Sequence, residues 1–90
     1  MKKLVQVQEV QGEGMEKLLG QSMTFFCGVY IYHGKLTGVN EKFALIENAH
    51  LVYDTGAFTA KTFNDAQYLG DEWRIMLSAI ETYGAFASKN

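Results

Sequence analysis

The sequence predicts a mainly β fold, because three apolar runs of strand character are separated by polar or glycine-containing breaks. The runs cover residues 23–27, 29–39 and 43–53, and they are rich in β-branched and aromatic side chains. Such residues favour strands, whereas glycine, asparagine and short charged segments favour turns. Asn40-Glu41-Lys42 is the clearest turn. The sequence therefore predicts a β-hairpin between residues 29 and 53.

The second of these runs carries a sign of strong curvature. Tyr30, Tyr32 and Leu36 alternate along it, and Gly34 occupies the same face. The missing side chain at such a position allows a strand to bend sharply over a core. We therefore expect a strongly bent strand at Gly34.

The N-terminal region allows two interpretations. Residues 4–10 place Val5 and Val7 on one face with glutamines between them, a period of two that is typical of a half-buried strand. The same segment is also compatible with a terminal extension. Residues 1–12 are therefore interpreted either as an extra strand or as an N-terminal extension. Met15, Leu18 and Leu19 then follow at helical spacing before Gly20, which predicts a short helix of about two turns.

The C-terminal half is less clear from periodicity alone. Residues 55–71 mix polar and aromatic side chains, which predicts a long loop or an extra hairpin. Beyond Ala66, apolar residues recur at intervals of three and four as far as Ile80, as on one face of a helix. Trp73, Ile75 and Leu77 also alternate as in a strand. Local periodicity favours the helix.

Composition limits the functional classes. Ninety residues predict one domain, and a hydrophobic content of 48% is high for so small a core, so we expect some apolar surface to be buried between subunits. Eight basic and ten acidic residues give a formal net charge of −2. The chain therefore lacks the overall positive field of a typical nucleic-acid binder, and any nucleic-acid contact is expected to be local.

The sequence contains few residues that could act in catalysis or bind a metal. Cys27 is the single cysteine, so no intrachain disulfide is predicted and a reducing, cytoplasmic setting is expected. His33 and His50 have no cysteine or carboxylate at metal-ligand spacing. The sequence also shows no recognisable catalytic set of a nucleophile, a general base and a group that orients the base. No apolar run approaches the length of a membrane span, about 20 residues. The sequence predicts a non-enzymatic protein without metal, cofactor or membrane contact.

Residues 33–49 contain Gly34, Gly38 and Asn40 in the order Gly-x-x-x-Gly-x-Asn, and this stretch resembles the first Sm motif shared by Sm, LSm and Hfq proteins. The resemblance implies an Sm-like small barrel, with a short N-terminal helix followed by a five-stranded, strongly bent antiparallel sheet. It assigns residues 73–77 to the fourth strand, Ser78 and Ala79 to a tight turn, and residues 80–86 to the fifth. It overrides the helical periodicity and makes residues 55–71 an enlarged loop within a single domain, residues 1–90.

The same resemblance implies a function. Sm-like subunits form homo-oligomeric rings, here expected to contain about five to seven copies, and they hold single-stranded RNA in the turns after the second and fourth strands. At the matching positions this chain has Lys42 in place of a stacking aromatic or histidine, and Leu77-Ser78 in place of a basic pair. The predicted RNA contacts are Lys35, Asn40, Lys42, Phe43 and Ser78. The alternative, favoured by the altered pocket, is a ring-shaped scaffold or protein-interaction module.

Overall fold

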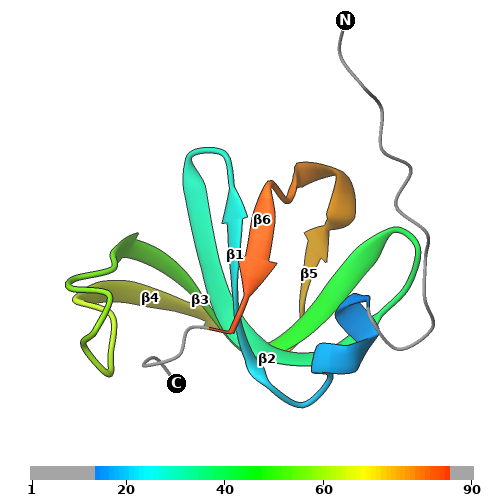
Figure 1. Ribbon diagram of the computed structural model, residues 1–90, viewed down its shortest axis with the longest axis horizontal. Coiled ribbons are helices and arrows are strands. Elements are labelled where there is room, and N and C mark those ends of the chain that lie inside the picture. Colours follow the sequence, from blue (N-terminus) through cyan, green and yellow to red (C-terminus); the bar gives the residue numbers. More distant parts are fainter. Residues whose placement is uncertain (1–13, 86–90) are drawn as a thin grey trace, which may run out of the picture.

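The computed structural model describes residues 14–85, whose strands all belong to one antiparallel sheet (Figure 1). The sheet order is β4-β3-β2-β1-β6, and β5 pairs separately with β3. Because β4 and β6 at the two ends of this order do not pair, the sheet remains open. Along the chain the elements are η1 (Met15–Leu18), β1 (Ser22–Cys27), β2 (Tyr30–Val39), β3 (Phe43–Asp54), β4 (Asp65–Gly70), β5 (Trp73–Met76), η2 (Leu77–Ala79) and β6 (Thr82–Gly84).

The first three strands confirm the predicted mainly β character and the predicted hairpin. β1, β2 and β3 coincide closely with the three apolar runs, and β2 pairs antiparallel with both neighbours. Gly28, at the β1–β2 turn, has a positive φ of 66°, which glycine adopts without steric cost. The local preferences of the sequence are sufficient for this part of the fold.

Strand β3 organises the C-terminal half of the sheet. β2 occupies one of its edges, and the other edge is shared by β5, along Phe43–Ile46, and by β4, along Ala49–Asp54. Only Asp71 and Glu72 separate β4 from β5. The enlarged loop that the resemblance implied for residues 55–71 is therefore wrong for Asp65–Gly70, which pairs with β3 as in the alternative of an extra hairpin. The sheet has six strands where five were expected.

Tertiary pairing also decides the ambiguous segment after residue 65. Ile75 is buried opposite Ala44, whereas Arg74 and Met76 are exposed. This alternation belongs to a strand, and the helical periodicity is overruled because the free edge of β3 gains backbone hydrogen bonds from it. η2 takes the place of the predicted turn at Ser78-Ala79, and β6 lies within the predicted fifth strand.

The N-terminal helix is shorter than predicted. η1 is a single four-residue 3-10 helix, followed by Gly20 with a φ of 88°. The backbone N–H of Gly20 donates to the carbonyl of Leu36, so the chain turns at once into β1 alongside β2. The predicted strand or extension over residues 1–12 lies outside the described residues.

The core fills the concave side of the bent sheet. β2 is strongly curved (Figure 1). The β2–β3 register shifts between His33 and Lys35, on either side of Gly34. A Cβ at Gly34 would lie 2.9 Å from both the carbonyl oxygen of Glu47 and Cδ1 of Ile46. Only glycine permits this approach. The buried cluster comprises Met15, Met23, Phe25, Leu36, Ala44, Ile46, Ala49 and Ile75.

Candidate nucleic-acid interface

The turn between β2 and β3 is held by the side chain of Asn40. Its Oδ1 accepts hydrogen bonds from the backbone N–H groups of Lys42 (2.8 Å) and Phe43 (2.9 Å). The backbone N–H of Asn40 donates to the carbonyl of Phe43 over 3.0 Å. An asparagine that bonds the following backbone in this way is a common turn-former. Asn40 therefore has a structural role in presenting the exposed Lys42 side chain.

The turn is joined to η2, which is distant in sequence. The backbone N–H of Leu77 donates to the carbonyl oxygen of Lys42 over 2.9 Å. Ser78 follows directly and is exposed. This hydrogen bond joins the turn that carries Asn40, Lys42 and Phe43 to η2, which carries Ser78. The β2–β3 turn lies at the right of the view in Figure 1.

Lys35 lies apart from this cluster. It faces Glu47 across the β2–β3 pair, and its Nζ is 3.6 Å from Oε1 of Glu47. Both side chains are about half exposed, so the pair contributes little to stability, roughly 0–1 kcal/mol. Its charge is compensated locally, and Lys35 is not part of the turn that carries Lys42.

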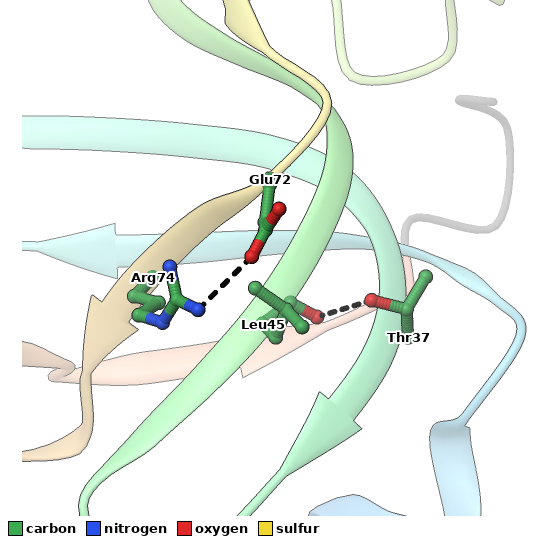
Figure 2. Close-up of polar contacts among 4 residues, drawn as sticks. All are labelled: Thr37, Leu45, Glu72 and Arg74. Atoms are coloured by element: carbon green, nitrogen blue, oxygen red, sulfur yellow. Dashed lines mark hydrogen bonds and ion pairs between the residues drawn. The ribbon is translucent and has the colours of Figure 1, made fainter.

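Arg74 is a member of the interface that sequence reasoning missed. Its guanidinium carbon lies 5.4 Å from the centroid of the Phe43 ring, which is cation–π geometry. Figure 2 shows that the same group donates to Oε1 of Glu72 over 3.0 Å, while Thr37 Oγ1 donates to the carbonyl of Leu45 over 3.2 Å. Arg74 reaches this position because the β3–β5 register places it opposite Leu45. Local periodicity does not reveal that register.

The electrostatic character of this end is mixed. Arg74 is paired with Glu72, and Glu41 adjoins Lys42 in the turn. Lys42 makes neither of the salt bridges found among residues 14–85. Of the two cations at this end, Lys42 and Arg74, only Lys42 lies outside these salt bridges.

A groove opens beside the same turn. It has a volume of about 700 Å³ and lies between η1, the start of the turn and the η2–β6 segment. Its lining includes three acidic residues, Glu16, Glu41 and Glu81. The apolar part of the lining consists of Met15, Val39, Leu77, Ile80 and Tyr83. A lining that combines apolar and acidic residues suits a protein segment better than a phosphate backbone.

Cys27 is the single cysteine of the sequence. It is half-buried and free, and its pKa is raised by burial and, to a smaller extent, by the carboxylate of Glu81. A thiol of raised pKa is a poor nucleophile at neutral pH. Within residues 14–85, no group of three or more histidine, cysteine or acidic side chains is arranged to hold a metal ion.

Comparison with protein-family models, curated proteins and solved structures finds no match for this chain. No helix within residues 14–85 is long and apolar enough to cross a membrane.

Proposed function

We propose that this chain is an Sm-like subunit of a homo-oligomeric ring that binds single-stranded RNA through the turn between β2 and β3. The observation that carries the proposal is the hydrogen bond between Leu77 and Lys42. It joins the two turns to which the Sm resemblance assigns RNA contact. These turns are more than thirty residues apart in sequence, and a common contact surface requires their proximity.

The strand arrangement supports the Sm-like assignment. If β4 and β5 are counted as one strand interrupted at Asp71 and Glu72, five strands remain in the order β4/5-β3-β2-β1-β6. A short helical turn precedes them, and β2 bends at Gly34. This is the order in which a single bent sheet can curl toward a small barrel, because β6 returns to pair with β1.

Two free strand edges support self-assembly. Among the described strands, β5 pairs only with β3 and β6 pairs only with β1, so each has one edge open. Apolar side chains lie exposed on both strands: Met76 is 50% exposed and Tyr83 is 40% exposed. Pairing of β5 in one copy with β6 in the next covers both edges. A head-to-tail contact of this kind forms a ring when the rotation between neighbouring copies closes, as the Sm resemblance implies here.

The chemistry of the turn suits weak, charge-dependent RNA binding. One exposed Lys42 per subunit becomes a circle of positive charge in a symmetric ring, which attracts phosphate groups. Phe43 and Arg74 add two flat groups, and bases stack on such surfaces with little regard to sequence. The adjacent carboxylates of Glu41 and Glu72 limit the affinity.

A scaffold is the second candidate, and a specific observation favours it. Glu47 and Glu72 already pair with Lys35 and Arg74, and Ser78 offers only a hydroxyl where the family uses a basic pair. A ring that kept its assembly edges and lost most of its RNA contacts would present the acidic groove beside the turn to a protein partner. Such a ring would form normally and ignore RNA.

The experiment that tests the proposal combines two measurements on nuclease-treated protein. Light scattering gives the mass of the particle, and fluorescence anisotropy follows binding of labelled oligo-U, oligo-A and mixed RNA across a salt series. The RNA-binding ring predicts a closed oligomer with binding that weakens as salt rises. A closed oligomer that binds none of the RNAs would identify the scaffold, and a stable monomer would refute the Sm-like assignment.

A further inference from the structure

The groove beside the β2–β3 turn is built from three segments that are far apart in the sequence. η1 supplies Met15 and Glu16, the end of β2 and the turn supply residues 39–41, and the chain from η2 to β6 supplies Leu77 and residues 80–83. Its volume of about 700 Å³ lies within the range of ligand-binding pockets, roughly 300–1,000 Å³. The groove is therefore large enough to hold several side chains of a bound molecule.

Apolar side chains from all three segments meet in this groove. Met15 is buried, Val39, Leu77 and Ile80 are half-buried, and Tyr83 is exposed. The three half-buried side chains also pack against the core cluster, which holds them in place. An apolar surface that is already ordered loses little entropy when a ligand covers it, so its burial favours binding.

The charged side chains of the lining are all acidic. They are Glu16, Glu41 and Glu81. Glu16 and Glu41 belong to neither of the salt bridges found among residues 14–85, and Glu81 accepts one hydrogen bond from a backbone N–H group. Lys17 and Lys42 adjoin two of these glutamates in the sequence but are not part of the lining. A concave surface lined by one sign of charge attracts the opposite sign, here cationic groups.

We propose that this groove binds a segment of another protein in which apolar side chains are interspersed with lysine or arginine. The apolar side chains cover Val39, Leu77 and Ile80, and the basic side chains pair with the carboxylates of Glu16 and Glu41. Arginine suits the carboxylates best, because its guanidinium group forms paired hydrogen bonds. The inference gives the chemistry of a protein partner and does not depend on RNA binding.

Charge distinguishes this partner from the chain itself. Residues 1–13, which directly precede the groove residue Gly14, contain two lysines and two glutamates, and Glu13 has the same charge as the lining. A second copy has a formal net charge of −2, so its overall charge also opposes binding to an acidic surface. A basic segment from a different protein is therefore the better match.

Most of the groove lies outside the strand edges proposed for self-assembly. Among the lining residues, only Thr82 and Tyr83 belong to β6, and none belongs to β5. The remaining lining comes from η1, the β2–β3 turn and the chain around η2. Binding to the groove can therefore be measured on the assembled full-length protein.

Methyl NMR of isotope-labelled full-length protein observes the groove directly, because Met15, Val39, Leu77 and Ile80 place methyl groups on its lining. The probe is a synthetic peptide of alternating leucine and arginine. Peptides of equal length that alternate leucine with glutamate, or serine with arginine, are the controls. We expect the leucine–arginine peptide to shift these methyl signals and to bind about tenfold tighter than either control, because only this peptide matches both the charge and the apolar surface.

Two double variants separate the groove from general attraction to an acidic protein. Glu16→Gln combined with Glu41→Gln removes two carboxylates of the lining and should weaken binding of the leucine–arginine peptide about tenfold. Asp65→Asn combined with Asp71→Asn is the matched control, because it removes the same charge from exposed residues of β4 and the position after it. The control variant should bind the peptide as the unmodified protein does.

Several outcomes would overturn the inference. These are equal binding of the three peptides, methyl shifts confined to residues outside the groove, and an equal loss of affinity in the two double variants. Shifts of the lining methyl signals in a Lys2→Glu, Lys3→Glu variant without peptide would identify residues 1–13 as the occupant instead. Shifts that follow protein concentration alone would identify a second copy. Tight, groove-specific binding of the leucine–arginine peptide supports the inference whether or not the protein binds oligonucleotides.

Discussion

Gly34 lies against the backbone of Glu47, so closely that a Cβ at Gly34 would stand 2.9 Å from the Glu47 carbonyl oxygen. The β2–β3 register also shifts here, between His33 and Lys35. Gly34→Ala is therefore expected to destabilise the fold by about 1–3 kcal/mol, the cost of forcing atoms into a packed interior. Gly38→Ala is the matched control, because its nearest contact would be an ordinary 3.8 Å to Leu45 Cβ. Urea denaturation of both variants at one protein concentration measures the difference, and equal midpoints would contradict it.

The Asn40 side chain is expected to stabilise the β2–β3 turn. Asn40→Ala removes the acceptor for the N–H groups of Lys42 and Phe43, at a cost of about 1 kcal/mol, since the site is exposed. Asn40→Asp keeps an oxygen in that position and should retain most of the stability. Chemical denaturation compares the two. A loss as large in the aspartate variant as in the alanine variant would show that the hydrogen bonds to Oδ1 are unimportant.

Lys42 is expected to supply the phosphate contact. Lys42→Ala should weaken RNA binding and flatten the dependence of log K on log salt by about 0.7 for each phosphate group of a single strand that the lysine neutralises. Lys61→Ala, an exposed lysine on the remote β3–β4 segment, is the control. Anisotropy with oligo-A across a salt series gives both slopes. If the slope of the Lys42 variant equals that of the unmodified protein, Lys42 does not contact RNA.

Assembly is expected to depend on the free edge of β5. Met76→Glu places a charge beside that edge, where a neighbouring copy would have to bury it, and should shift the particle toward smaller species in light scattering. Tyr68→Glu on β4 serves as the control, because Tyr68 is 51% exposed and Met76 is 50% exposed. Unchanged mass for both variants over a dilution series would place the interface elsewhere.

The pKa of Asp54 is lowered by the backbone N–H of Gly56 and, to a lesser extent, by the Asn64 side chain. A carboxyl whose pKa is lower in the folded protein stabilises the fold at pH values above its unfolded pKa, about 3.9, and this stabilisation is lost as pH falls through the folded pKa. Asn64→Ala should raise the Asp54 pKa and begin that loss at a higher pH. Carboxyl carbon NMR titration measures the shift, with Thr62→Ala as the control. An unshifted titration would show that Asn64 does not affect the carboxylate.

The candidate interface was predicted only in part from the sequence. Asn40, Lys42 and Phe43 form one turn, and that turn was recognisable from its residues because its hydrogen bonds are local. Arg74 was missed, because its position over Phe43 depends on the pairing of β5 with β3. The pocket lined by His33 and His50 was not predicted for the same reason, since its other wall comes from a segment after Asp54 that has no regular pattern.

The sequence by itself determined β1, β2 and β3, which are the first three strands of residues 14–85, and the turn at Asn40. Side-chain alternation, glycine and turn residues act over a few neighbouring positions, so their effects are legible in the chain. Only the tertiary structure decided that residues 65–76 form strands, that η1 is a single 3-10 turn, and that Lys42 meets Leu77. The reason is that the unpaired edge of β3 offers backbone hydrogen bonds to any segment that reaches it, and this outweighs the helical spacing of apolar residues in that segment.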